Sequence, residues 1–598
     1  MAFIKVLVPG PWWHELTYDS DADCGAGIRV LVPMGRGERV GLCVGAEGEP
    51  SPARTRRICA VIDKEPVLPG DYIRSARVVA SAFLCSTADV LRTLLPSSFW
   101  RGEPFPIYRS KSQNDTSGTT EFYYRYSDAE RFQFYREQIL ETVTGALILF
   151  PEREQARQFH KSLIGILPKE RIILWPVSNA SATMRAWKSA LSAERPVIIG
   201  GPGAAAAPLK TNSLIVVEEE ASLSWRSKSP PVFSLRSFAA ARSRELGGRL
   251  VLGGRIPSSR VFSGFSPEET ERGQENAVVR MIDMKAASRL QYQGMQFPLP
   301  LSDALISDTV HHVGAGSIVF WLLDRRGVSG EIHCADCGQP IICARCGAPC
   351  VIEKGILRCP LCGNKSSAPD FCPSCGGRIL EGSSPGLELL RTTAEHLLNG
   401  RPVVMWHGDD PANQTEARER LTILKKEGGL VLGSRRALTL LDSLSPALLA
   451  WLDADAEARR PSYMSRFYAY SMLLESCWRG GAPRDVLLQT RRFSQPWVRG
   501  LLAGWRYFWN VELKERSSLG FPPVSHLVEI ETPSGWGSGC EEFLYQLDEA
   551  GFFTLRPGKG RKISVFTPHM AALRHFLECY FTISRSRFGF PRLEVWSD

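Results

Sequence analysis

The chain has 598 residues, a formal net charge of +9, 44% hydrophobic residues and 23% charged residues. Its length predicts several domains, and its composition is that of an ordinary globular protein with buried cores. No run of 18 apolar residues occurs and the N-terminal residues lack the pattern of a signal peptide, so we expect a cytoplasmic protein without a membrane span.

The first predicted unit covers residues 1–105 and begins with β-strands. Short alternating apolar runs lie on both sides of the turn signal Met34-Gly-Arg-Gly, and helical periodicity follows at 71–95. The stretch 106–126 contains the polar segment Ser-Gln-Asn-Asp-Thr-Ser-Gly, which predicts a linker.

Two sets of apolar runs alternate with helical segments further along the chain, at 127–265 and at 300–330 with 383–523. Continuous apolar strands between helices are typical of parallel sheets that are buried on both faces. We therefore predict two α/β lobes in tandem, with the segment 331–382 inserted after the first strand of the second lobe. Residues 524–598 mix strands with a helix and predict a C-terminal α+β domain.

The inserted segment contains eight cysteines arranged as four Cys-x-x-Cys pairs. The two-residue spacing points both sulfurs of a pair at one ion, so four pairs predict two four-cysteine zinc sites. A closed shell of thiolates leaves no open ligand position, which makes both ions structural. The spacing allows the outer and the inner pairs to share ions, or the pairs to combine in chain order. The pairs are Cys334 with Cys337, Cys343 with Cys346, Cys359 with Cys362 and Cys372 with Cys375. Cys350 belongs to none of these Cys-x-x-Cys pairs and is interpreted as a packing residue.

Two segments carry a resemblance to a known family. Residues 319–327, Val-Phe-Trp-Leu-Leu-Asp-Arg-Arg-Gly, lead into the cysteines, and residues 515–523 read Glu-Arg-Ser-Ser-Leu-Gly-Phe-Pro-Pro. Together with the order of the domains, they resemble the PriA family of replication-restart DNA helicases over nearly the whole chain. The resemblance implies a nested zinc pairing, with Cys334, Cys337, Cys372 and Cys375 on one ion and Cys343, Cys346, Cys359 and Cys362 on the other.

The expected fold class is therefore α/β and multidomain. It consists of two tandem RecA-like helicase-type lobes with an inserted two-zinc module, an N-terminal β-rich module and a C-terminal α+β domain. In the family the N-terminal module captures the 3′ end of a DNA strand. The resemblance implies that Leu16, Thr17, Gly35 and Arg56 form this pocket, although the family has Phe-Asp where Leu16 and Thr17 stand. The tryptophans near arginines at 497–509 have a spacing that favours one buried helical face over stacking on DNA bases.

The ATPase motifs of this family are missing or altered. No Gly-x-x-x-x-Gly-Lys-Ser/Thr occurs in the chain, and the stretch 135–145, where the loop is expected, has the pattern of an amphipathic helix. The family's Asp-Glu-Glu-His appears as Glu218-Glu219-Glu220-Ala221, and its last motif keeps only Arg479. Two further altered motifs are Gly254-Arg255-Ile256 and Gly433-Ser434-Arg435. We therefore do not expect this chain to hydrolyse ATP.

These features predict a PriA-like protein that binds branched or forked DNA and single-stranded DNA. It would help to assemble the primosome for loading the replicative helicase, without helicase activity of its own. Primosome and helicase-loading proteins are the expected partners, and two structural zinc ions are the expected cofactors. Two alternatives stay open: an active ATP-dependent 3′ to 5′ helicase with divergent motifs, and a zinc-ribbon scaffold that no longer binds DNA.

Overall fold

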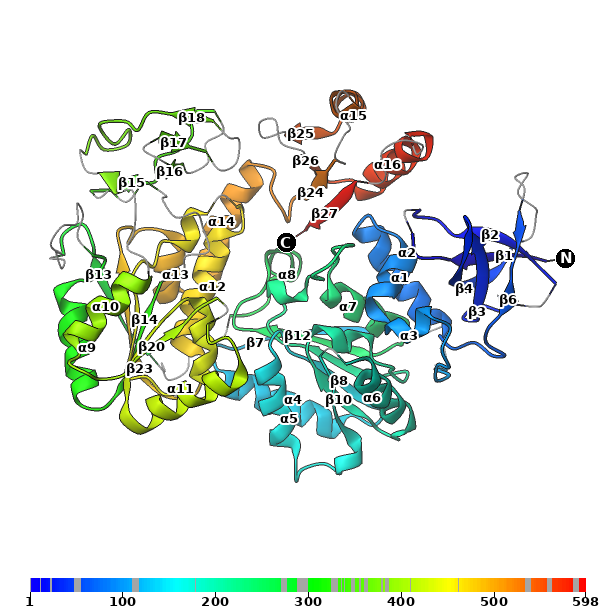
Figure 1. Ribbon diagram of the computed structural model, residues 1–598, viewed down its shortest axis with the longest axis horizontal. Helices are drawn as coiled ribbons and strands as arrows, with labels where there is room; N and C mark the ends of the chain where they lie inside the picture. The colour runs from blue at the N-terminus through cyan, green and yellow to red at the C-terminus, as the bar shows by residue number, and fades with distance from the viewer. Residues whose placement is uncertain are drawn as a thin grey trace.

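The computed structural model places an N-terminal β-barrel and two α/β lobes next to one another in an elongated molecule (Figure 1). The described residues are 2–10, 12–21, 24–47, 55–109, 118–177, 179–269, 277–287, 299–323, 332–334, 336–337, 339–345, 350–353, 356–359, 364–377, 380–381, 387–408, 410–460, 462–532, 539–555, 562–584 and 591–597. None of the helices in these ranges combines the length and the apolar character that a membrane span requires.

The N-terminal barrel closes because one short segment bonds both ends of its sheet, whose strand order is β5-β2-β1-β4-β3-β6. Ile58 N donates to Asp19 O of β2 at 3.1 Å. The next residue, Cys59, donates its N–H to Leu31 O of β3 at 2.7 Å. The strands are β1 (Ala2–Leu7), β2 (Leu16–Ser20), β3 (Arg29–Met34), β4 (Gly37–Glu47), β5 (Arg56–Arg57) and β6 (Ala60–Val61).

Three helices attach the barrel to the first lobe. Tyr72 OH, on α1, donates to Ala206 O of the lobe at 3.1 Å, and both residues are buried. Tyr108 OH, after the last of the three helices, donates to Leu209 O at 2.6 Å. The barrel and the first lobe are therefore joined by a packed, hydrogen-bonded interface. The helices are α1 (Gly70–Ala82), α2 (Thr87–Leu94) and α3 (Ser97–Trp100), and α1 packs on α7 (Leu235–Glu245) of the lobe.

Lobe 1 is built on a parallel sheet with the strand order β7-β12-β11-β8-β10-β9. Alternate residues of its strands face two separate buried clusters, which explains their continuous apolar sequence. Strand β7 lies inside the segment expected to be a linker, so the sheet begins earlier than predicted. The remaining elements are β7 (Thr119–Tyr124), α4 (Asp128–Glu141), β8 (Ala146–Leu149), α5 (Arg153–Leu163), η1 (Lys169–Arg171), β9 (Ile172–Leu174), α6 (Ala180–Ser192), β10 (Val197–Gly200), η2 (Pro202–Ala206), β11 (Leu214–Val217), η3 (Leu223–Trp225), β12 (Arg249–Gly254) and α8 (Ser259–Phe265).

Lobe 2 repeats the topology of lobe 1. Its parallel sheet has the order β13-β23-β22-β14-β21-β20. When strands are counted along the chain, both sheets read first, sixth, fifth, second, fourth, third. Strand β13 begins before residue 300, the expected start of this lobe. The elements are β13 (Ala277–Asp283), α9 (Asp303–Gly314), β14 (Ile318–Leu322), α10 (Leu387–Leu397), β20 (Val403–Trp406), α11 (Gln414–Glu427), β21 (Gly429–Gly433), η4 (Arg435–Asp442), β22 (Leu448–Trp451), η5 (Glu457–Arg459), α12 (Ser465–Trp478), β23 (Arg484–Thr490), α13 (Pro496–Ala503) and α14 (Trp505–Ser518).

Two smaller units complete the molecule. The cysteine-containing segment lies between β14 and α10, with β15 (His333–Cys334), β16 (Val351–Glu353), β17 (Ile356–Arg358), β18 (Lys365–Ser366) and β19 (Leu380–Glu381). The C-terminal unit has an antiparallel sheet, β25-β26-β24-β27, with helices α15 and α16. Its elements are β24 (His526–Glu531), α15 (Gly539–Glu549), β25 (Phe553–Leu555), β26 (Lys562–Thr567), α16 (Met570–Ser584) and β27 (Arg592–Trp596). The architecture confirms the predicted α/β fold class.

Candidate functional sites

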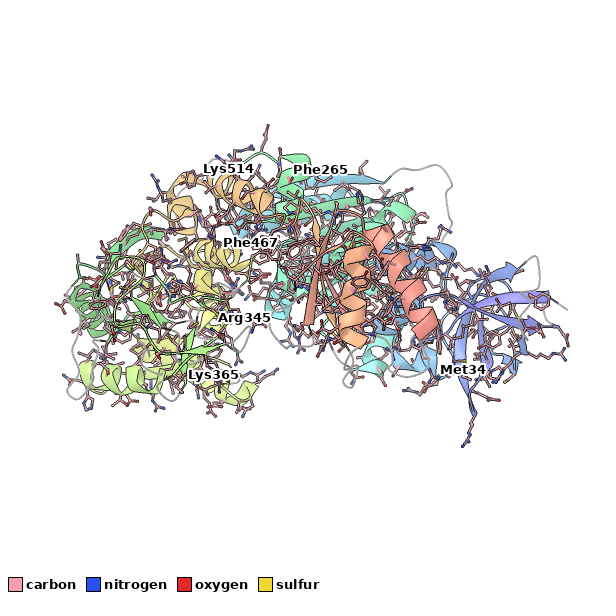
Figure 2. All side chains as sticks on the ribbon, turned by 90° about the horizontal axis from the view of Figure 1, so that it is seen from above. Met34, Phe265, Arg345, Lys365, Phe467 and Lys514 are labelled. Atoms are coloured by element: carbon pink, nitrogen blue, oxygen red, sulfur yellow. The ribbon has the colours of Figure 1, made fainter. Side chains whose placement is uncertain are left out.

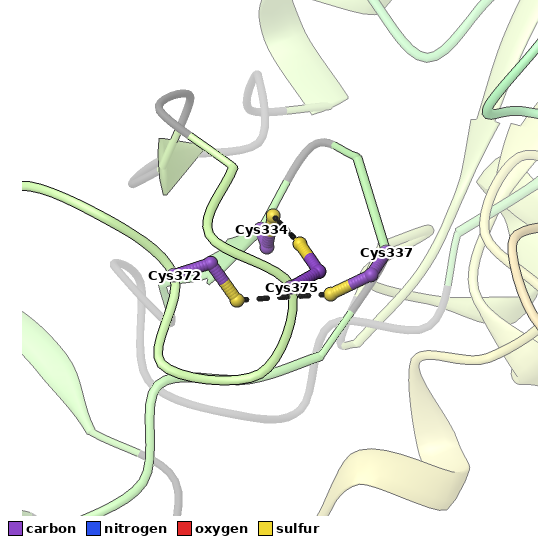
Figure 3. Close-up of side chains that lie close together, drawn as sticks. All are labelled: Cys334, Cys337, Cys372 and Cys375. Atoms are coloured by element: carbon purple, nitrogen blue, oxygen red, sulfur yellow. Dashed lines mark hydrogen bonds between the residues drawn. The ribbon is translucent and has the colours of Figure 1, made fainter.

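The outer cysteine pairs of the inserted segment converge on one point (Figure 3). The Cys334 and Cys375 sulfurs lie 3.6 Å apart, and those of Cys337 and Cys372 lie 3.7 Å apart. All four sulfurs lie within 4.8 Å of one another. A tetrahedral zinc ion with Zn–S bonds of about 2.3 Å holds its sulfurs roughly 3.8 Å apart, so this arrangement fits such an ion.

The backbone around this cluster explains its geometry. Strands β15 and β19 pair antiparallel, with Cys334 opposite Leu380, which brings the two arms of the segment together. The Cys372 N–H donates to Gly377 O at 2.8 Å and closes the second turn. A Cβ atom added to Gly377 would lie 2.0 Å from Asp336 Oδ2 and 3.1 Å from the Cys334 sulfur, so the chain passes close to the cluster at this glycine.

The inner cysteine pairs are described in part. Cys346 and Cys362 lie outside the described residues, so the second predicted zinc site stays a prediction. Cys343 and Cys359 are buried, and the Cys343 sulfur accepts from Arg345 N at 3.4 Å. Cys350 packs with buried apolar residues of the same small core, as its interpretation as a packing residue requires.

A buried ionic cluster fills the carboxyl ends of the lobe 1 strands. In a nucleotide-binding lobe, a phosphate-binding loop joins a strand to the following helix. The prediction placed the position of this loop at 135–145, but Tyr135 lies inside α4, and the connection from β7 to α4 consists of residues 125–127 alone. Arg131, in the first turns of α4, is completely buried. Its guanidinium donates to Glu218 at 2.7 Å and to Asp128 at 2.6 Å.

Glu218 follows β11, where the family motif places its metal-binding carboxylate. Both of its oxygens are already bonded, since Tyr135 OH donates to Oε2 at 2.7 Å and Arg131 Nε donates to Oε1 at 2.9 Å. Oxygen atoms of Asp128, Glu218 and Glu219 lie within 4.8 Å of one another, a grouping that suits a cation. Arg131 supplies a cation there, and the buried Arg255 pairs with Asp128 and Glu219. The chain's own guanidinium groups therefore take the position of a metal ion.

The charges of this cluster are not fully balanced, because three carboxylates face the two guanidinium groups of Arg131 and Arg255. Burial raises the pKa of Glu219 to about 7, although both guanidinium groups oppose the shift. The pKa of Asp128 is lowered, because Arg255 and Arg131 outweigh the cost of its burial. The carboxyl group of Glu219 therefore titrates near neutral pH.

Arg479, the arginine that the chain keeps from the last family motif, bridges the two lobes. Arg479 follows α12 and is 1% exposed. It donates to Asp442 at 2.6 Å and to Glu475 at 2.6 Å within lobe 2. It also donates to Glu152 of lobe 1 at 2.5 Å and 3.1 Å. Gly480 N, next in the chain, donates to Asp128 Oδ2 at 3.3 Å.

A cavity of about 400 Å³ lies between the lobes beside this bridge. Its walls carry both signs of charge, with Arg435, Arg436 and Arg460 from lobe 2 facing Glu152 and Glu219 from lobe 1. Phe467 of α12 also lines it, and Figure 2 places this side chain between the two lobes. The altered motif residues thus surround a mixed-charge space without a phosphate-binding loop.

Of the four residues expected in the DNA-end pocket, three lie on the neighbouring strands β2 and β5, and Gly35 lies in the turn between β3 and β4. Leu16 and Thr17 begin β2, Arg56 is paired with Tyr18 of the same strand, and Gly35 forms the turn after β3. Tyr18 OH contacts Met34 Sδ at 3.2 Å, which brings the start of β2 close to that turn. Arg56 and Gly35 are exposed, and Leu16 and Thr17 are half-buried.

Sequence reasoning predicted the burial of the aromatic residues but missed the ionic cluster. Trp497, Trp505 and Trp509 are at most 1% exposed, which confirms their burial. The single helical face is wrong, because Trp497 lies on α13 and the other two lie on α14, after the helix break at Gly504. Arg131 lies three residues after Asp128, a helical spacing that ordinarily indicates a surface ion pair. The contact between Glu152 and Arg479 joins residues far apart in the chain and has no local sequence signal.

Comparisons with known proteins agree with this architecture. Residues 5–96 match the family described as the 3′DNA-binding domain of PriA. The chain is 23% identical to the replication restart protein PriA of Treponema pallidum over 578 residues, which cover 87% of this chain and 86% of that protein. It is 23% identical to PriA of Thermotoga maritima and 22% identical to PriA of Bacillus subtilis. These two matches cover 65% and 66% of this chain but only 53% and 50% of those proteins.

Among solved structures, Saccharomyces cerevisiae Dbp5 bound to RNA and ADP BeF3 is 14% identical, covering 68% of this chain and 90% of that one. The TM-score of this match is 0.34. The evidence for the fold class therefore comes from the two sheets of this chain. The two parallel sheets with one shared strand order define the class as a protein with tandem RecA-like helicase-type lobes. Within that class, the chain is PriA-like.

Proposed function

We propose that this chain binds branched or forked DNA during replication restart and helps to assemble the primosome, without hydrolysing ATP. The observation that carries the proposal is a PriA-type 3′DNA-binding module docked on a lobe that lacks a phosphate-binding loop. In this proposal the chain still recognises DNA, whereas the groups that phosphoryl transfer requires are missing. Forked DNA, single-stranded DNA and the proteins that load the replicative helicase are the proposed partners.

The loss of ATPase chemistry is supported by the site itself. Phosphoryl transfer needs backbone N–H groups and a lysine on the phosphates, and a carboxylate that holds Mg²⁺. In this chain a three-residue turn stands in place of the loop. The carboxylate of Glu218 already forms an ion pair with the buried Arg131. A Mg²⁺ ion would have to displace a guanidinium from a closed interior.

The cysteine module has a structural role in the proposal. Two zinc ions held by thiolates would fold this small segment, which contains little apolar core of its own. The module contacts lobe 2 through Arg492, which donates to Gln339 at 2.9 Å. It therefore presents a surface to partner proteins from a defined place on the lobe.

The test measures DNA binding and ATP hydrolysis by the same zinc-replete protein. Fluorescence anisotropy should show binding to forked DNA whose affinity falls as salt rises from about 50 to 200 mM, because phosphate contacts release counterions. Phosphate release from ATP should stay at the level of the buffer with and without the fork. DNA-stimulated turnover that is lost in Glu219→Gln would overturn the proposal in favour of a divergent helicase. Absence of fork binding would favour a zinc-ribbon scaffold.

A further inference from the structure

Among the described residues, three sets of contacts are prominent between lobe 1 and lobe 2. The first is the ion-pair bridge of Arg479, whose guanidinium lies between Glu152 of lobe 1 and Asp442 of lobe 2. Gln158 of lobe 1 adds a hydrogen bond to Asp442 O at 3.3 Å. Opening the lobes would separate Arg479 from Glu152 and expose a guanidinium that is now buried.

The second set holds the N-terminus of α14. Glu269 follows lobe 1, and its carboxylate accepts from Trp505 N at 2.7 Å and from Arg506 N at 2.9 Å. The same carboxylate accepts from Tyr126 OH of lobe 1. A carboxylate at a helix N-terminus is favoured by the unpaired N–H groups and the helix dipole, so Glu269 ties α14 of lobe 2 to lobe 1.

The third set consists of tryptophan side chains of α14 that pack against lobe 1. Trp509 of α14 donates from Nε1 to Pro257 O of lobe 1 at 3.0 Å. The rings of Trp505 and Trp509 lie 5.9 Å and 6.3 Å from the ring of Phe262, on α8. Figure 2, seen from above, shows Phe265 of α8 and Lys514 of α14 on the same side of the molecule. Both tryptophans are buried, so separating the lobes would expose their rings to water.

We propose that these contacts hold the two lobes closed permanently, so that nucleotide has no part in setting their relative position. In many enzymes, lobes or lids close when a ligand bound between them contacts both sides. Here guanidinium, carboxylate and tryptophan side chains of the chain itself make those contacts. A ligand can shift a conformational equilibrium only if it binds one of the two states more tightly. In this chain, side-chain contacts take the place of the nucleotide contacts that would give such a difference in affinity.

This inference goes beyond the proposed function, since it concerns the mechanics of the lobes and holds whether or not DNA binds. It implies that the space between the lobes has a fixed shape. Any DNA segment or protein that contacts both lobes would meet a rigid platform.

The test measures the distance between the lobes in the full-length protein. Labels on noncanonical amino acids at Lys188 of α6 and Lys425 of α11, both exposed, report this distance by Förster transfer without touching the cysteines. We expect one narrow distance distribution that is the same without nucleotide, with Mg²⁺-ATP and with a nonhydrolysable analogue. A broad or two-population distribution that narrows on addition of nucleotide would overturn the inference.

Two double variants identify the contacts responsible. Glu152→Gln with Glu269→Gln weakens two of the three sets and should add a population at longer distance. The control is Glu154→Gln with Glu268→Gln, because both residues are exposed neighbours that lie outside the three sets. Circular dichroism of both variants verifies that the lobes remain folded. A distance distribution in the first variant that matches the control would show that these carboxylates do not hold the lobes.

Discussion

Arg131 and Glu218 form an ion pair in which both side chains are completely buried. Two nitrogens of the guanidinium donate to the carboxylate, at 2.9 Å from Nε and 2.7 Å from Nη2. The cation that neutralises the Glu218 carboxylate therefore belongs to the chain itself. Buried pairs of this kind contribute little net stability, but either partner left alone in the interior is costly.

The first prediction concerns the removal of this cation. Arg131→Met leaves the Glu218 carboxylate buried without its main partner, so we expect the free energy of unfolding of lobe 1 to fall by about 3–5 kcal/mol. Urea unfolding followed by tryptophan fluorescence measures the change. Adding Glu218→Leu to Arg131→Met should restore most of the loss, because the unpaired charge is then removed. Equal destabilisation in the single and double variants would contradict the buried pair, and Arg136→Met on the same helix serves as the control.

The second prediction follows from the proton on Glu219. Its pKa is about 7 in the folded protein, whereas its ordinary value is 4.5. Between these values the folded state binds more protons than the unfolded state, so this group makes stability fall as pH rises from about 4.5 to 7. Glu219→Gln should remove this contribution and flatten the curve of melting temperature against pH. An identical curve for the variant and the parent protein would show that Glu219 titrates normally.

The third prediction separates metal ligands from packing cysteines. Cys372→Ser removes one ligand of the observed cluster, so the zinc content should fall by about one ion per chain. Cys350→Ser changes a buried cysteine of the same module that belongs to no pair, and should keep the full zinc content. Mass spectrometry of the metal after gel filtration measures both. Loss of zinc from Cys350→Ser would assign that cysteine to a metal site.

The fourth prediction tests whether Arg56, on strand β5 of the barrel, takes part in binding the 3′ end of DNA. Arg56→Ala should weaken binding to DNA with a recessed 3′ end about tenfold, the effect of one charge-assisted hydrogen bond. Arg57→Ala is the matched control, because both side chains are exposed and Arg57 is paired with Asp21. Anisotropy titrations with a labelled fork give both affinities. Equal losses in the two variants would indicate a general charge effect in place of a pocket.

The sequence was sufficient to predict the parts of the molecule that depend on local pattern. Continuous apolar strands predicted both sheets, and cysteine spacing predicted four-cysteine zinc sites. The grouping of Cys334, Cys337, Cys372 and Cys375 on one ion was implied by the resemblance to the PriA family, because the spacing alone left two pairings open. Strand β7, Thr119–Tyr124, was missed because it follows a polar stretch and has no continuous apolar run. Its pairing to β12 is decided by tertiary contacts that no local pattern records.

The ionic contacts were also beyond local pattern. Arg131, Glu219 and Arg255 come from three separate segments and meet only because parallel strands end at one edge of the sheet. Burial converts what would be ordinary surface charges into a fixed network. The second zinc site stays a prediction because Cys346 and Cys362 lie outside the described residues. The DNA-end pocket depends on a nucleic acid, which the fold of the chain alone does not identify.

The shared strand order of the two lobes has a consequence for the cysteine module. In lobe 1 the second strand, β8, passes to α5 through residues 150–152. In lobe 2 the equivalent passage from β14 to α10 contains the entire module, whose first and last strands pair with each other. The two ends of the module therefore lie side by side. The three-residue connection in lobe 1 therefore suggests how a variant without the module can be built, with a three-residue loop that joins β14 to α10.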